Sequence, residues 1–331
     1  MEAPDLHERL MTESCRATRC AFRTPLARSV IGLGLSAATL ACAEPEETAR
    51  SAETEQPAAQ PLERPVSGVL YHTELSFVGQ GAEPSLLHLR FDNRTDSTSI
   101  HLSYRGWFGG DEWRRILDQS DSLPVPRAAW RVLPSGPVRI VAGEGGEPSS
   151  VILELAEGGL RLDSRGAIGS WNSSTGQRES LKLAELLGES GAEEGLLLAR
   201  QSARRADELP GIGPGQYFLV SDTAGNGLLI MRDSTSPDEP VVVRTWFDDT
   251  ESEWDDALVL ALAAAEDSPG RWSFELPEAG LLGELRGAGP PLDVGSGDDD
   301  GVEVFRVEAA LVLEGQSWTM RGIGVQEQTV E

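Results

Sequence analysis

Three neighbouring segments of the chain each carry one histidine. Histidine is both a common metal ligand and an acid–base catalyst. His72, His88 and His101 each fall on the polar side of a segment in which polar and apolar residues alternate. If hairpins join these segments, His72 and His101 lie about 10 Å apart, on either side of the strand that carries His88. Arg90 stands in the row between them. A cation there disfavours a metal, so we expect no metal site and a solvated sheet face.

Two acidic runs offer the oxygen ligands that calcium prefers, one at residues 248–256 and one at 298–300. Neither run has the spacing of an EF-hand loop, in which alternating acidic residues are followed by Gly and a distant Glu. Acidic residues are also abundant throughout the chain. We therefore expect both runs to be solvated loops.

Recognisable nucleophiles are missing from the sequence. It has no G-x-S-x-G elbow, and no cysteine follows Cys42. Lys182, the lone lysine, lies in no motif for Schiff-base chemistry. The glycine strings GIGPG and GEGG do not precede Lys-Ser/Thr, as a phosphate loop requires. Paired-carboxylate hydrolysis stays open because many acidic pairs exist. We expect no cofactor, and a binding protein rather than an enzyme.

Aromatic residues supply the remaining chemistry. Most of the eight tryptophans are expected in hydrophobic cores. The segment Gly106-Trp107-Phe108-Gly109-Gly110 places two rings between glycines, which predicts a loop that exposes them. We expect Trp107, Phe108 and Trp113 to line a cleft for a lipid-like small molecule.

The overall charge restricts the partners. The net charge is −26, from 54 acidic and 28 basic residues. Such a field repels nucleic acid and anionic lipid headgroups, so we expect no nucleic-acid partner. A hydrophobic content of 39% is nevertheless sufficient for packed cores.

The N-terminal region indicates export. Residues 29–41, SVIGLGLSAATLA, have the length of a signal-peptide core and are too short to span a membrane. Residues 43–66 lack aromatic and branched aliphatic residues almost entirely, which is typical of a disordered tether. We therefore predict a signal peptide at 1–41 and an acidic tether at 42–66.

The end of that signal peptide, Thr39-Leu40-Ala41-Cys42, resembles the lipobox of bacterial lipoproteins. The resemblance implies cleavage before Cys42 and lipidation of Cys42. It also implies an anchor in the bacterial envelope, at the outer membrane facing the periplasm. Thr39 stands where the family usually has Leu, so ordinary cleavage and secretion without an anchor stay open.

From Val66 onward, alternation of apolar and polar residues with Gly- and Pro-rich turns predicts short strands. Residues 180–209 are ambiguous, and we favour strands there. The fold class is all-β, with two apposed antiparallel barrel or sandwich units. The Pro/Gly segment at 209–215 predicts a boundary between a domain at 67–208 and a domain at 209–331. A loose echo of Trp and Pro spacing between the halves is compatible with duplication or with chance.

Two stretches carry a further resemblance, YFLVSDTAGNGLLIMRD at 217–233 and VEAALVLEGQSWTMRGIGVQE at 307–327. They look like the second half of two-barrel lipocalin-like proteins, a group that includes carotenoid hydratases and the AttH type. The resemblance implies two apposed barrels and an apolar ligand cleft. The residues that serve hydratase chemistry have no match here, so the activity is not implied.

Three functions are therefore compatible with the sequence. The first is a membrane-tethered protein that binds an apolar or amphipathic small molecule without chemistry. The second is a lipocalin-like enzyme that acts on an isoprenoid or lipid. The third is a structural or interaction lipoprotein without a ligand.

Overall fold

The computed structural model describes residues 67–328 except for short segments. Those segments are 111, 126–131, 144–146, 157, 173–176, 206–215, 233–240, 248–249, 258–269, 290–291, 294–300 and 314. The described residues belong to one compact unit. No helix among them has the length and apolar character needed to cross a membrane. Cys42, the predicted signal peptide and tether, the boundary at 209–215 and the run 298–300 lie outside these residues.

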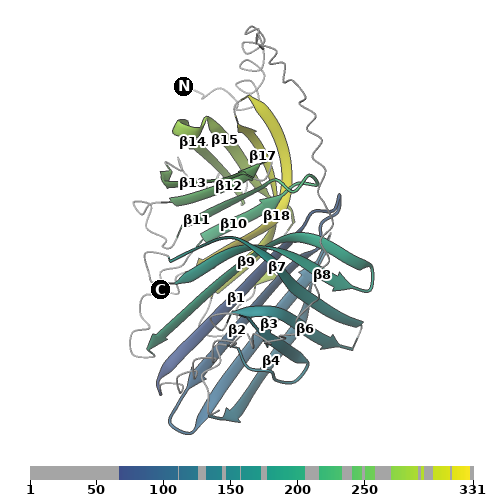
Figure 1. Cartoon of the computed structure of the whole chain (residues 1–331), viewed down its shortest axis with the longest axis vertical. Helices are drawn as coiled ribbons and strands as arrows, with labels where there is room; N and C mark the ends of the chain where they lie inside the picture. The colour runs from purple at the N-terminus through teal and green to yellow at the C-terminus, as the bar shows by residue number, and fades with distance from the viewer. Residues whose placement is uncertain are drawn as a thin grey trace, which may run out of the picture. The chain divides into compact units, whose positions relative to one another are not determined.

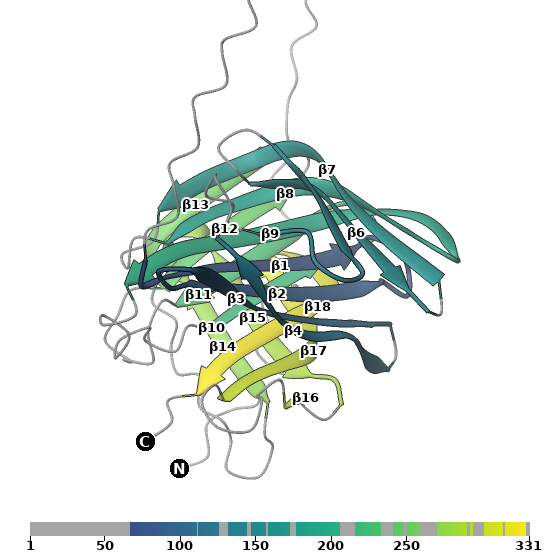
Figure 2. The ribbon, with the colours of Figure 1, turned by 90° about the horizontal axis from the view of Figure 1, so that it is seen from below.

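The first sheet is antiparallel and, in the described part, has nine strands in the order β4-β3-β2-β1-β9-β8-β7-β6-β5 (Figure 1). Figure 2 shows β7, β8, β9, β1 and β2 following one another across it. Its strands are β1 (Val69–Gly79), β2 (Leu86–Thr95), β3 (Ser99–Gly109), β4 (Trp113–Pro124), β5 (Val138–Ala142), β6 (Pro148–Leu155), β7 (Gly158–Asn172), β8 (Arg178–Gly188) and β9 (Gly191–Arg205).

The second sheet is also antiparallel, with the order β13-β12-β11-β10-β18-β17-β15-β14 and β16 paired to β17 among the described residues. Its strands are β10 (Gln216–Ser221), β11 (Gly227–Arg232), β12 (Val241–Phe247), β13 (Thr250–Ala257), β14 (Arg271–Leu276), β15 (Leu281–Gly287), β16 (Leu292–Asp293), β17 (Gly301–Leu313) and β18 (Gln316–Gln328). One 3-10 turn (Pro277–Ala279) interrupts the described strands between β14 and β15.

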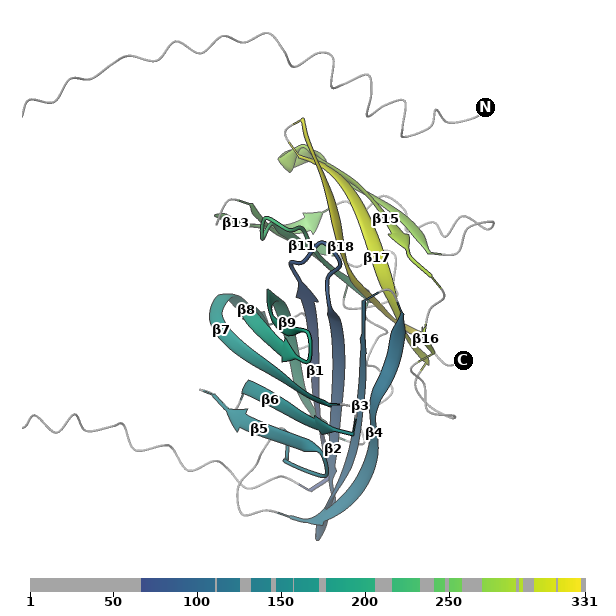
Figure 3. The same ribbon diagram turned by 90° about the vertical axis from the view of Figure 1, so that its right-hand side faces the viewer.

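Both sheets follow the same path. In each, four strands form a meander, and the last strand returns to pair with the first, β9 with β1 and β18 with β10. Figure 3 shows how the first sheet curls, with β5 to β8 bent back opposite β2 to β4. The predicted all-β class with two antiparallel units is confirmed, and residues 180–205 form strands as expected.

Alternation along each strand divides the core into three clusters. Leu75 and Phe77 of β1 belong to the cluster inside the curl of the first sheet. Phe218 and Val220 of β10 belong to the cluster inside the second sheet. A third cluster, which we call the intersheet core, joins the other faces of the two sheets, where Val78, Leu86, Trp107, Leu198, Leu219 and Ile323 pack together.

Turn geometry sets the register at the intersheet face. A two-residue turn joins Gly188 of β8 to Gly191 of β9, and Gly191 has a φ of 113°, a region that favours glycine. Because this turn fixes the pairing of β8 with β9, Glu179 lies directly opposite Arg200.

Candidate functional site

A single cross-strand row of mostly charged residues crosses the intersheet face of the first sheet. Trp171 of β7 pairs with Glu179 of β8, and Glu179 pairs with Arg200 of β9. Arg200 pairs with Glu74 of β1, which pairs with Arg90 of β2. Opposite charges thus alternate between neighbouring strands, the arrangement that favours cross-strand pairs.

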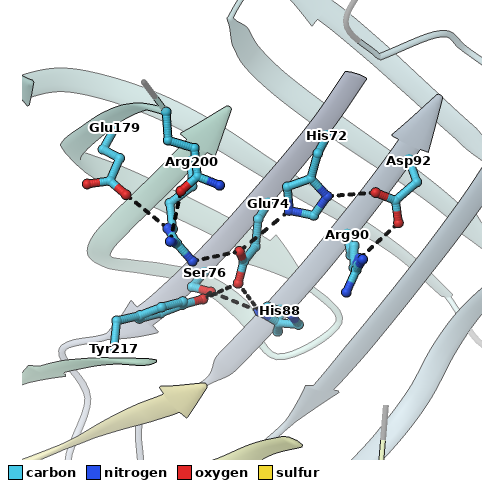
Figure 4. Close-up of polar contacts among 10 residues, drawn as sticks. His72, Glu74, Ser76, His88, Arg90, Asp92, Glu179, Arg200 and Tyr217 are labelled. Atoms are coloured by element: carbon cyan, nitrogen blue, oxygen red, sulfur yellow. Dashed lines mark hydrogen bonds and ion pairs between the residues drawn. The ribbon is translucent and has the colours of Figure 1, made fainter. Parts of the chain in front are cut away.

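The rows on either side add the remaining polar residues. Ser76 lies opposite His88, and His72 lies opposite Asp92. Tyr217 reaches the group from β10 of the second sheet. We call these nine residues the polar cluster, and Figure 4 shows their contacts: His72, Glu74, Ser76, His88, Arg90, Asp92, Glu179, Arg200 and Tyr217.

Arg200 holds two buried carboxylates. Its Nε donates to Glu179 Oε1 at 3.1 Å, and its Nη1 donates to Glu74 Oε2 at 3.2 Å. Its Nη2 donates to Gln177 Oε1 at 2.9 Å. Burial alone would favour the neutral acid, but the Arg200 guanidinium holds the pKa of Glu74 well below its usual range. Glu74 is therefore ionised and accepts hydrogen bonds only.

His72 is charged at neutral pH. Its Nδ1 donates to Asp92 Oδ1 at 2.6 Å, and its Nε2 lies 3.7 Å from Glu74 Oε2. Burial lowers the pKa of an imidazole, but the Asp92 carboxylate outweighs burial and raises the pKa of His72 to about 9. Asp92 also accepts a hydrogen bond from Arg90 Nε at 2.8 Å.

Tyr217 connects the two sheets. Its hydroxyl donates to Glu74 Oε1 at 2.5 Å and lies 2.7 Å from Ser76 Oγ. The Arg200 guanidinium carbon lies 5.0 Å from the centroid of its ring. Burial, together with the adjacent Glu74 carboxylate, raises the pKa of Tyr217 well above its usual value, so the phenol keeps its proton.

Counting protons fixes the state of His88. The single hydroxyl proton of Tyr217 goes to Glu74, so in the contact between Ser76 and Tyr217 the serine donates. The proton of Ser76 is then used, so His88 Nδ1 donates to Ser76 Oγ, 2.9 Å away. Three groups, His88, Ser76 and Tyr217, therefore donate in one direction, and the chain ends on the Glu74 carboxylate.

His88 is a neutral base in a buried position. Burial lowers its pKa to about 4, against the opposing attraction of Glu74. Because Nδ1 carries the proton, Nε2 presents a lone pair, and this atom has no hydrogen-bond partner in the described structure. The Trp107 ring lies beside the imidazole, with centroids 5.7 Å apart.

This arrangement can accept a proton. When Nε2 takes up a proton, the proton on Nδ1 can pass to Ser76, and those of Ser76 and Tyr217 can shift toward Glu74. A base oriented by a second group and linked to a carboxylate is the general arrangement of acid–base sites. The charges of the polar cluster sum to zero before any proton is taken up. Arg90, Arg200 and protonated His72 carry the positive charges, and Glu74, Asp92 and Glu179 carry the negative charges.

The structure corrects three sequence-based expectations. The acidic run at 248–256 is not a loop in its described part, because β13 spans Thr250–Ala257 and pairs with β12. His72 and His88 do not lie on a solvated face, because the second sheet covers that face. His101 alone is solvent-exposed, beside Asp96. The loop predicted at Gly106–Gly110 is also wrong, because β3 runs through Gly109 and buries Trp107.

The other two aromatic residues of the predicted cleft lie apart from the cluster contacts. Phe108 packs against the core inside the first sheet, and Trp113 packs against the edge of the intersheet core. Of the three aromatic residues of the predicted cleft, Trp107 contacts the polar cluster, through the His88 ring. A role for Trp107, Phe108 and Trp113 in ligand binding stays a prediction.

Sequence reasoning missed Glu74, Arg200 and Tyr217. The available signal was the density of charged residues on one face of adjacent strands, in HTELS at 72–76 and HLRFD at 88–92. Arg200 lies more than one hundred residues from Glu74 in the sequence, and Tyr217 belongs to the other sheet. Local residue spacing therefore could not predict these contacts.

No metal centre accompanies the cluster in the described residues. No group of three or more His, Cys, Asp or Glu side chains there has the geometry to hold a metal. A small hollow lies between the β1–β2 turn and β17/β18, lined by Pro84, Leu86, Arg306 and Gly322 among others. His88 does not line it, although Leu86 lies two residues away on the same face.

Comparison with known proteins finds no match among protein-family models or curated proteins. Among solved structures, the chain is similar to kievitone hydratase from Nectria haematococca, with 11% identity and a TM-score of 0.47, over 79% of this chain and 88% of that one. It is also similar to a protein described as an AttH from Nitrosomonas europaea, with 9% identity and a TM-score of 0.44, over 79% and 92%. Both similarities concern the backbone fold.

Proposed function

We propose that this protein is an enzyme that catalyses proton transfer, with His88 as the general base. The observation that carries the proposal is the buried lone pair on His88 Nε2, at the start of a relay that ends on Glu74. An unprotonated imidazole at neutral pH is the form that removes a proton. Perturbed titratable groups clustered in one place are typical of such sites.

The surroundings of His88 favour an uncharged, largely apolar substrate. The cations and anions of the cluster are paired with one another, so the cluster keeps no unpaired charge that could neutralise a charged ligand. The side chains around the cluster on the same face are apolar, Trp107, Leu86 and Leu198 among them. His88 is fully buried, so a substrate reaches Nε2 only if neighbouring side chains move.

Hydrogen–deuterium exchange into a substrate tests this proposal without knowledge of the complete reaction. The purified protein is incubated in D2O with a panel of neutral isoprenoid and aliphatic ketones and alcohols, and deuterium on carbon is measured by mass spectrometry. We expect exchange with the wild type, and a loss of about 100-fold or more in His88→Gln. His101→Gln, at the exposed histidine, is the matched control. Equal rates in the wild type and His88→Gln would contradict the proposal.

A second candidate is a structural role, in which the cluster serves to hold the two sheets together. The observation that favours it is the mutual pairing of the charged side chains, with Tyr217 of one sheet bonded to Glu74 of the other. Under this candidate, neutral substitutions in the cluster weaken the sheet contact and no substrate is turned over.

We further propose that the protein is a lipoprotein of the bacterial envelope, anchored through Cys42. The support is the lipobox-like segment Thr39-Leu40-Ala41-Cys42, followed by an acidic stretch. Metabolic labelling with a fatty acid tests it. We expect incorporation in the wild type and none in Cys42→Ser, whereas unchanged labelling in Cys42→Ser would contradict lipidation there. Binding of a lipid-like ligand without chemistry stays a prediction from the sequence.

A further inference from the structure

A chain of contacts leads from the second sheet into the far side of the polar cluster. The guanidinium carbon of Arg244, on β12, lies 3.7 Å from the centroid of the Trp171 ring on β7. The indole Nε1 of Trp171 donates to Glu179 Oε2 at 2.6 Å. The other oxygen of Glu179 accepts from Arg200, which also holds Glu74.

These side-chain contacts join the two sheets at both ends. The series of contacts begins at Arg244 of the second sheet, crosses β7, β8, β9 and β1 of the first sheet, and returns to the second sheet at Tyr217. Arg244 is 4% exposed, so its cation is buried at the contact with Trp171. A buried cation on an indole face is stabilising and fixes the ring in place.

We infer that Trp171 and Arg244 are positioning residues that set how Arg200 is shared between Glu179 and Glu74, and through Glu74 control how readily His88 takes up a proton. The inference rests on the proposed function and adds its regulation. Because Arg244 belongs to the second sheet, the base is tuned only while that sheet is in contact with the first.

The direction of the effect follows from charge. Arg200 is shared between two carboxylates, so any change that strengthens its pairing with one weakens its pairing with the other. When Arg200 neutralises Glu74 less, the negative charge of Glu74 favours protonation of His88, whose Nδ1 lies 3.8 Å from Glu74 Oε1. The titratable and charged groups that face His88 are Glu74 and His72 on β1, Arg90 on β2, Arg200 on β9 and Tyr217 on β10.

Two substitutions should therefore shift the pKa of His88 in opposite directions. Trp171→Phe keeps a ring under Arg244 but removes the N–H from Glu179, which then draws Arg200 away from Glu74, so the pKa of His88 rises. Glu179→Gln removes the competing carboxylate, so Arg200 pairs with Glu74 alone and the pKa of His88 falls. We expect shifts of roughly half a unit or more. If Trp171 and Glu179 had a purely structural role, the two substitutions would not shift the pKa of His88 in opposite directions.

The experiment is an NMR titration of the imidazole Cε1–H signals in the full chain, without substrate. The chain has only four histidines, so single substitutions assign every signal. Trp246→Phe is the matched control, because Trp246 is a buried tryptophan of the same intersheet core whose Nε1 donates to Gly225 O at 3.1 Å, outside the cluster. Arg244→Lys keeps the cation and should shift the pKa of His88 less than Arg244→Leu does.

The outcomes separate this inference from the proposed function. Opposite shifts in Trp171→Phe and Glu179→Gln, with none in Trp246→Phe, support it even if no substrate exchanges deuterium. Shifts of the same sign, or an equal shift in Trp246→Phe, would overturn it. If Trp171→Phe does not fold, Arg244→Leu takes its place. It removes the cation that holds the Trp171 ring beside Glu179, so it should also raise the pKa of His88, opposite to Glu179→Gln.

Discussion

The two sheets have the same strand path but opposite chemistry on the faces where they meet. Where the first strand pairs with the last, the first sheet places Glu74 opposite Arg200. The second sheet places Leu219 opposite Ile323 at the corresponding pairing of β10 with β18. On the next strand, Arg90 faces Glu74 in the first sheet, whereas Leu229 faces Leu219 in the second.

This difference separates what the fold needs from what the site needs. The second sheet forms the same path with apolar side chains at the corresponding positions, so the path does not require charges there. Burying an ion pair costs desolvation that the attraction only partly offsets, and apolar replacements of similar volume are often at least as stable. A cluster whose charged members all belong to one sheet is therefore better explained by function than by folding.

The largest expected effect comes from removing one central charge. Arg200→Met leaves Glu74 and Glu179 buried without their cation, which should lower the free energy of unfolding by about 3–5 kcal/mol. The corresponding position of the second sheet is Ile323, and Ile323→Val should lower it by only about 1 kcal/mol. Urea denaturation of both variants measures the contrast. Similar losses would remove the distinction between the sheets.

A neutral version of the cluster sharpens that result. In the triple variant Arg200→Met, Glu74→Gln, Glu179→Gln, Arg200 is replaced together with both carboxylates that it holds, and His72 can lose its proton so that Arg90 and Asp92 balance. Most of the lost stability should therefore return. Deuterium exchange into substrates should nevertheless stay lost, because Glu74 no longer anchors the relay. A triple variant as unstable as Arg200→Met would favour the structural candidate.

The pairing of His72 with Asp92 gives a pH-dependent effect of about 2–3 kcal/mol. The pKa of His72 is raised to about 9 in the folded protein, so the pair's contribution is fully present below pH 6.5 and is lost as pH rises through 9. Asp92→Asn should therefore destabilise the protein more at pH 6 than at pH 10, by this amount. Denaturation at the two pH values measures it.

Asp96→Asn is the matched control for that experiment. It makes the same change beside His101, where both side chains are about half exposed to solvent. Solvent screens such contacts, so the difference between the two pH values should be much smaller than for Asp92→Asn. Equal pH dependence in the two variants would contradict the assignment of a buried, charged His72.

Removing the tyrosine hydroxyl should cost about 1–3 kcal/mol, because Glu74 and Ser76 then lose a buried partner. Tyr217→Phe tests the relay, and Tyr104→Phe is its control inside the first sheet, where the hydroxyl bonds to the Leu133 backbone. Both variants should lose similar stability by thermal denaturation. Only Tyr217→Phe should reduce deuterium exchange, and an equal reduction in both would contradict the relay.

The smallest effect is expected at the exposed histidine. His101 lies on the first sheet with a side chain that is 55% exposed. His101→Gln should change the free energy of unfolding by no more than about 0.5 kcal/mol and leave deuterium exchange unaltered. A large effect of His101→Gln would show that burial is not what distinguishes His72 and His88 from His101.

The fold class was predictable because period-2 alternation and turn residues act locally, as in Val69–Phe77 and Leu86–Phe91. The polar faces of these strands were also identified correctly, including His72 and His88. What covers those faces was not predictable. A half-buried strand with a solvated face and one with a covered face share the same alternation, and Tyr217 and Arg200 come from distant parts of the chain. The loop predicted around Trp107 was wrong because its flanking glycines were taken as the sign of a loop, whereas they lie within or just beyond a strand.

The most direct test of the account is the tautomer of His88, measured by long-range ¹H–¹⁵N NMR on the wild type between pH 5.5 and 8. We expect a neutral ring with a protonated Nδ1 and an Nε2 chemical shift typical of an unprotonated nitrogen. An assignment through His88→Gln secures the signal, and exposed His101 serves as an internal reference. A proton on Nε2, or a charged imidazolium across that range, would contradict the relay and with it the proposed base.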